Sequence, residues 1–95
     1  MTITEIFNLG NKFMQEGNLQ TAVQMWQECI KINPEFGLSH YNLAQFLRSQ
    51  NNLRGAFDEY SKFMDSPVTG RTLDLIPQVK QILVDIEKQL NPLKV

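Results

Sequence analysis

Apolar side chains recur at steps of three and four residues over most of this chain, which is the period of one face of an α-helix. The first stretch of this kind runs from Thr2 to about Glu16. Thr2 and Glu5 have the spacing of a capping box, so we expect the helix to begin there. Gly17-Asn18 predicts its end, because Gly supplies the left-handed conformation at a helix C-terminus and Asn18 can cap the next helix.

The following segments repeat the same pattern. The second helix is predicted to end near Asn33-Pro34, because proline disfavours helical geometry in the residue before it. A third helix is expected from Leu38 to about Gln50, and Asn51-Asn52 then takes the turn position that Gly17-Asn18 occupies in the first pair. A fourth helix, with Ala56 and Tyr60 on its inner side, is predicted to end before Ser66-Pro67.

The C-terminal part begins with a linker, residues 67–71, in which Pro67 and Gly70 act as helix breakers. A fifth helix is predicted at about residues 73–90. Pro77 is compatible with that helix only in its first turn, where no intrahelical N–H bond is lost. We therefore expect the helix to begin shortly before Pro77, for example with Asp74 as the N-cap. Its apolar stripe predicts a terminal helix that covers the exposed side of the second helix pair.

A repeat relates the first two helix pairs. Ile6-x-x-Leu9-Gly10-x-x-Phe13, Ala22-x-x-x-Trp26 and Pro34 form the first copy, and His40-x-x-Leu43-Ala44-x-x-Leu47 and Ala56-x-x-x-Tyr60 follow thirty-four residues later. A period of that length with these aromatic, Leu, small and Pro positions resembles the tetratricopeptide repeat (TPR), a helix-turn-helix unit.

This resemblance covers residues 3–66 and implies an all-α fold, a right-handed α-solenoid of two repeats plus a terminal helix, five helices in all. We expect one domain over residues 1–95. Its parts are repeat 1 at about 3–36, repeat 2 at about 37–68, the linker at 67–71 and a capping helix at about 73–90.

The resemblance also implies a function, because the first helix of each TPR unit lines a concave groove that binds a partner peptide or helix. The family's contact positions fall on Phe7, Asn8, Asn11, Met14, Tyr41, Asn42, Gln45 and Arg48. Asparagine can bond a peptide backbone through both its donor and its acceptor, and aromatic rings offer apolar walls at little entropic cost.

One branch of the family holds a partner's C-terminal carboxylate with a clamp of lysines, asparagines and an arginine. Asn11 and Asn42 fall on its asparagine positions, but Phe7, Thr72 and Ile76 stand where cations are required. We therefore expect acidic chaperone-type tails to bind weakly, because charge-assisted bonds stabilise a free carboxylate.

Composition narrows the remaining functions. Nine basic and ten acidic residues are evenly spread, which is not the clustered basic surface that nucleic acid requires. The sequence has no long apolar run and no basic leader followed by one, so we expect a cytoplasmic protein that does not enter membranes. One Cys and one His cannot make a zinc site, and no nucleophile, base or phosphate loop indicates an enzyme or a cofactor. Cys29 and His40 are interpreted as packing residues.

Two functions remain open. The first is a non-enzymatic adaptor that binds a protein or peptide in the groove. The second is a self-assembling scaffold, in which the uncapped face of the first repeat or the terminal helix, through Val79, Ile82 and Ile86, docks on another copy.

Overall fold

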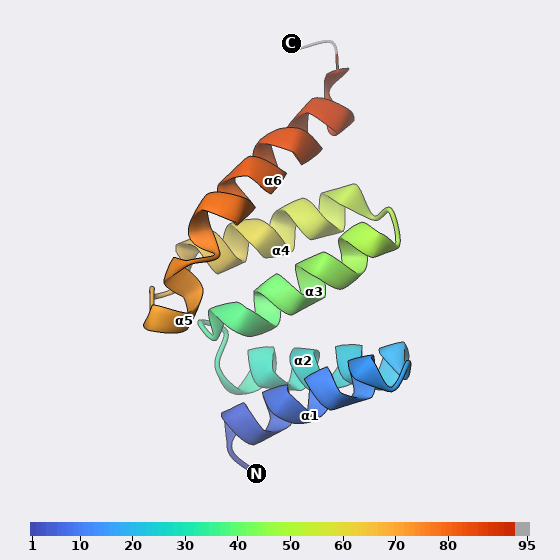
Figure 1. The fold of residues 1–95 in the computed structure, drawn as a ribbon, viewed down its shortest axis with the longest axis vertical. Coiled ribbons are helices and arrows are strands. Elements are labelled where there is room, and N and C mark those ends of the chain that lie inside the picture. The colour runs from blue at the N-terminus through green and yellow to red at the C-terminus, as the bar shows by residue number, and fades with distance from the viewer. Residues whose placement is uncertain (93–95) are drawn as a thin grey trace.

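The computed structural model describes residues 1–92, and this part of the chain is all-helical. Its helices are α1 (Ile3–Gln15), α2 (Leu19–Ile32), α3 (Gly37–Ser49), α4 (Leu53–Asp65), α5 (Gly70–Leu73) and α6 (Ile76–Leu90). Two antiparallel hairpins, α1/α2 and α3/α4, stack on one another through α2 and α3 (Figure 1). The last helix, α6, lies across α4 and closes that end of the stack.

The predicted starts of α1, α2 and α4 are confirmed, whereas α3 begins at Gly37, one residue before the predicted Leu38, and has no side-chain cap. Glu5 N donates to Thr2 Oγ1 at 3.1 Å and Thr2 N donates to Glu5 Oε1 at 2.9 Å, so the capping box is complete. These bonds lower the pKa of the Glu5 carboxyl from its ordinary value. Asn18 and Asn52 cap α2 and α4, each accepting from a backbone N–H three residues on.

The two hairpin turns also share an unusual backbone geometry. Gly17 has φ +82° and Asn51 has φ +60°, and these are the positive φ values of the described chain. Gly and Asn adopt this left-handed region with the least strain. The turn residues identified from the sequence therefore have the same conformation in both hairpins.

The C-terminal part differs from the prediction in two respects. A short sixth helix, α5, begins inside the predicted linker, where Thr69 N donates to Thr72 Oγ1 at 2.9 Å and Thr72 N to the Thr69 carbonyl at 3.1 Å. Asp74 does not cap the following helix: Leu75 is the N-cap of α6, and Pro77 lies in its first turn. The reciprocal threonine bonds close a first helical turn early, which moves the break between the two helices to Asp74-Leu75.

The core consists of two clusters that follow the helix pairs. One joins α1, α2 and α3 around Phe7, Trp26 and Cys29, and the other joins α3, α4 and α6 around Tyr60 and Phe63. Small residues lie where helices approach closely, as expected from the sequence. A methyl group at Gly10 would lie 2.7 Å from Nε1 of Trp26, for example, and Ala22, Ala44 and Ala56 are fully buried.

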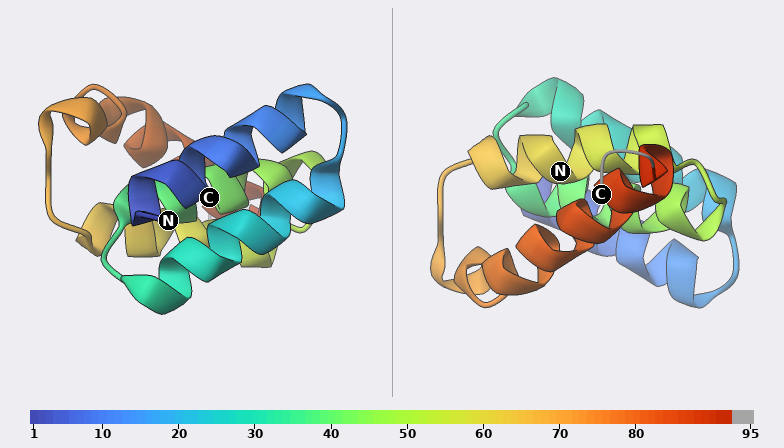
Figure 2. Two further views of the ribbon diagram at one scale, coloured as in Figure 1. Left: turned by 90° about the horizontal axis from the view of Figure 1, so that it is seen from below. Right: turned by 90° about the horizontal axis from the view of Figure 1, so that it is seen from above.

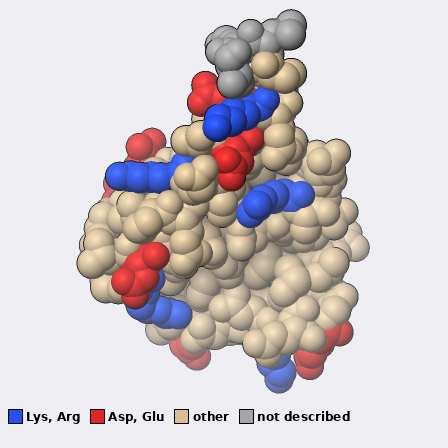
Figure 3. All heavy atoms as spheres, turned by 45° about the horizontal axis from the view of Figure 1, so that its top comes forward, with Lys and Arg blue, Asp and Glu red and all other residues tan. Residues whose placement is uncertain are grey.

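The face drawn in Figure 3 carries interspersed charges of both signs and has no concentrated basic patch. Within residues 1–92, none of the helices has the length and apolar character needed to cross a membrane.

Candidate functional site

A groove of about 630 Å³ runs along the side of the molecule where α1, α3 and α5 meet. Figure 2 shows α5 on the side of α3 away from α2, where α1 also lies, and α6 runs from there across α4. The groove is lined by Phe7, Asn11, Met14, Gln15, Leu19, Trp26, Leu38, Tyr41, Asn42, Gln45, Phe46, Ser49, Arg71 and Leu75. We call this surface the main groove.

The main groove includes most of the contact residues expected from the sequence. Phe7, Asn11, Met14, Tyr41, Asn42 and Gln45 all line it. Asn8 and Arg48 are exposed on α1 and α3 but do not belong to its lining. The largest difference between the expected and the observed lining is Arg71, which the sequence placed in a linker and which the structure places on α5. The Thr69–Thr72 spacing was the signal that could have indicated a helix there.

The centre of the main groove is an amide pair that joins the two hairpins. Asn42 Nδ2 donates to Asn11 Oδ1 at 2.7 Å, between residues that lie thirty-one positions apart. A side-chain amide has two N–H donors and one carbonyl acceptor, so the Nδ2 group of Asn11 and the Oδ1 atom of Asn42 keep free hydrogen-bonding capacity. The pair therefore presents a donor and an acceptor side by side, which is the complement of a peptide group.

Aromatic rings form the walls on either side of this pair. Phe7 packs on Phe36 with ring centroids 5.4 Å apart, and Tyr41 lies against Phe63 at 5.5 Å and Tyr60 at 6.2 Å. Phe7 is only 3% exposed, so it contributes a ring edge and helps to hold the first hairpin together. Rings fixed in this way are pre-organised, and a ligand does not have to order them.

Gln45 is held in place from behind the groove. The Tyr60 hydroxyl, which is buried in the core, donates to Gln45 Oε1. Burial raises the pKa of Tyr60 from its ordinary value, so the phenol stays protonated and remains a donor. The side-chain amide nitrogen of Gln45, Nε2, keeps two N–H donors for a ligand or for water.

A second cavity of about 590 Å³ continues from the main groove, and we call it the side pocket. It is lined by Thr4, Asn33, Glu35, Phe36, Gly37, Leu38, Pro67, Thr69, Gly70, Arg71 and Thr72. Leu38 and Arg71 belong to both linings, so the two hollows meet at these side chains.

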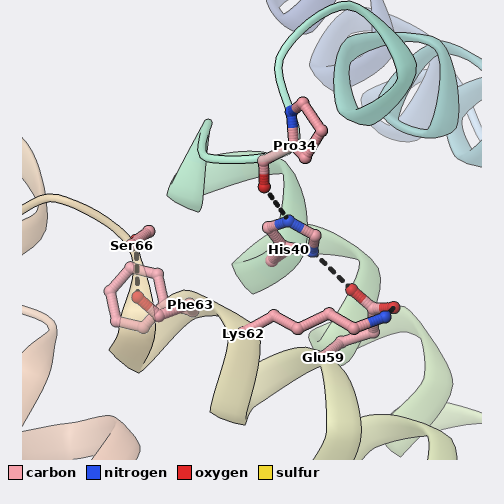
Figure 4. A network of polar contacts seen from close by, with 6 residues as sticks. All are labelled: Pro34, His40, Glu59, Lys62, Phe63 and Ser66. Atoms are coloured by element: carbon pink, nitrogen blue, oxygen red, sulfur yellow. Dashed lines mark hydrogen bonds and ion pairs between the residues drawn. The ribbon is translucent and has the colours of Figure 1, made fainter.

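A buried polar network lies outside both hollows, where α3 meets α4 (Figure 4). His40 Nδ1 is 2.7 Å from Oε2 of Glu59, and its Nε2 is 2.7 Å from the carbonyl of Pro34. Both neighbours are acceptors, which favours the doubly protonated ring, and the Glu59 bond raises the His40 pKa above its ordinary value. The sequence predicted His40 as packing but did not predict its polar partners.

Cys29 is fully buried, and its Sγ donates to the carbonyl of Ile3 at 3.6 Å. Burial raises the pKa of this thiol, so it stays protonated and unreactive. The described residues hold no cluster of three or more side chains that could bind a metal ion.

The residues predicted for self-association are largely used within the chain itself. Val79 and Ile86 are 0% and 1% exposed in the cluster around Tyr60, and Ile82 packs beside them. A second copy could reach Val79 and Ile86 only if α6 left α4.

No family model and no curated protein sequence matches this chain.

Proposed function

We propose that this chain is a cytoplasmic, non-enzymatic adaptor of the TPR type, a right-handed two-repeat solenoid that binds an extended partner peptide in the main groove. The observation that supports it best is the Asn11–Asn42 pair, which offers a free donor and a free acceptor between fixed aromatic walls. An extended segment exposes one N–H and one C=O per residue, and this pair can bond both.

The assignment to TPR units has independent support in the local geometry. The turn residues Gly17 and Asn51 share a left-handed φ, and the caps Asn18 and Asn52 follow them in both hairpins. Equivalent conformations at a thirty-four-residue spacing fit a structural repeat better than two unrelated hairpins.

The test is a selection of random nonapeptides displayed on phage against the immobilised wild-type protein, followed by affinity measurements on the synthesised peptides. The key variant is Asn11→Ala/Asn42→Ala. Removing both partners of a hydrogen bond together changes stability little. Loss of two bonds to the peptide should weaken binding at least tenfold, since one bond contributes about 1 kcal/mol.

The matched control is Asn8→Ala, on the same helix but outside the groove lining. We expect it to bind the selected peptides as the wild type does. Selection without any enriched peptide, or peptides that bind the double variant and the wild type equally, would contradict the proposal.

A further inference from the structure

The charge of the main groove indicates which kind of side chain a bound peptide should carry. Among the described residues that line the main groove, Arg71 is the single charged side chain, and none is acidic. Arg71 is exposed on α5, and within residues 1–92 it takes part in no ion pair. Its five N–H donors therefore face an otherwise neutral surface.

The side pocket adds a second requirement at the same place. Phe36, Leu38 and Pro67 provide apolar surface there, and Gly70 leaves room beside them, because a methyl group at Gly70 would meet no atom within 4 Å. A volume of about 590 Å³ accommodates a large apolar side chain. Burying such a side chain favours binding, because its apolar surface is removed from water.

The position of Arg71 links the two features. Arg71 and Leu38 line both hollows. In a bound peptide, the residue whose side chain enters the side pocket is therefore close in sequence to the residue whose side chain reaches the Arg71 guanidinium. Glu35 belongs to the lining of the side pocket but not to that of the main groove. A partner carboxylate is therefore favoured on the main-groove side of Arg71, away from Glu35.

We propose that the partner is an extended internal peptide segment in which an acidic side chain pairs with Arg71 and a bulky apolar side chain close to it in sequence fills the side pocket. This inference rests on the proposed function of the main groove. It differs from a carboxylate clamp, because one arginine can hold a single side-chain carboxylate and the described lining of the groove contains no second cation.

The experiment compares phage selections of random nonapeptides on the wild type and on Arg71→Glu. Arg54→Glu, which reverses an exposed charge on α4 away from the groove, is the matched control with the same net charge. We expect wild-type and Arg54→Glu peptides to contain Asp or Glu within three positions of Phe, Trp, Leu or Met. Arg71→Glu should select Lys or Arg in place of the acid.

Affinities of the selected peptides give the second readout. Changing the acidic residue to Lys should weaken binding to the wild type at least tenfold and strengthen binding to Arg71→Glu, and affinity for the wild type should fall as salt is raised. Amidation of the peptide C-terminus should leave affinity unchanged, and a large loss on amidation would overturn the internal segment in favour of a free C-terminus.

The two proposals fail in different ways. Peptides that lose binding to Asn11→Ala/Asn42→Ala but show no acidic preference, or bind Arg71→Glu as tightly as the wild type, overturn the Arg71 inference and leave the groove function standing. Peptides that do not respond to the asparagine variant, or no enriched peptide at all, overturn both.

Discussion

His40 Nδ1 lies 2.7 Å from Oε2 of Glu59, and this contact joins α3 to α4 inside the second hairpin. The other ring nitrogen bonds the carbonyl of Pro34, in the segment that connects the two hairpins (Figure 4). His40 is only 3% exposed, and Glu59 also receives a bond from Lys62 at 3.3 Å. One buried side chain thus ties the second hairpin to the end of the first.

We predict that this contact makes stability depend on pH. The bond to Glu59 raises the His40 pKa above 6.5. The stability that protonated His40 contributes is therefore complete below pH 6.5 and is lost as the pH rises through the pKa of the folded state. Burial opposes ionisation of Glu59, but the bonds from His40 and Lys62 prevail and lower its pKa below 4.5, so that its contribution is lost in acid. The free energy of unfolding, measured by urea denaturation, should gain most from the pair between pH 4.5 and 6.5.

Glu59→Gln should lower the free energy of unfolding at pH 6 by about 2 kcal/mol, because it replaces a hydrogen bond to a charged group that is largely buried. It should also flatten the decline above pH 6.5. The control is Glu28→Gln. The Glu28 carboxylate lies 3.9 Å from Nζ of Lys31 in an exposed i,i+3 pair, the same spacing as that of Glu59 and Lys62, so its loss should change stability little. Parallel pH curves for the wild type and Glu59→Gln would show that His40 is not the titrating group.

Gly10→Ala should destabilise the first hairpin by about 1–2 kcal/mol. The new methyl group would lie 2.7 Å from Nε1 and 2.9 Å from Cδ1 of Trp26, so the ring or the helices must shift, and this cost exceeds the gain in helix propensity. Gly70→Ala is the control, because a methyl group there meets no atom within 4 Å. Chemical denaturation should show a loss for Gly10→Ala and no loss for Gly70→Ala.

Ile86→Glu should unfold the protein or detach α6, because it places a charge in a site that is 1% exposed. Val84→Glu, at a position on the same helix that is 47% exposed, should leave the fold unchanged. Light scattering should give a mass of about 11.0 kDa for the wild type and for Val84→Glu at all concentrations. A dimer that Ile86→Glu dissolves into folded monomers would instead favour self-assembly through α6.

The helices of the two hairpins were predictable because each has strong local signals. Capping residues, turn residues and a three- to four-residue apolar period agree for α1, α2 and α4, and α3 has the apolar period without a side-chain cap. The region after Pro67 was predicted less well, since α5 depends on one reciprocal pair, Thr69 and Thr72, with a weak sequence signature.

The groove was predictable only where the repeat fixed its residues. In the thirty-four-residue period Asn42 corresponds to Asn8, and Asn11 corresponds to Gln45. The family's contact positions placed Asn11 and Asn42 in the groove, although the sequence did not show that they bond each other. Arg71 could not be found in this way, because its position depends on how the chain turns after α4. The partners of His40 are likewise a matter of tertiary packing, since Glu59 lies nineteen residues away.

The two hairpin turns provide a final test of the repeat. Gly17 has φ +82°, and a methyl group there would meet no atom within 4 Å, so substitutions at this site probe backbone strain alone. Gly17→Ala should lower the free energy of unfolding by about 1 kcal/mol, because the left-handed region is strained for a residue with a Cβ. Gly17→Asn should cost less, since Asn51 already adopts φ +60° at the equivalent turn. Equal losses for Ala and Asn in urea denaturation would mean that the two turns are not conformationally equivalent.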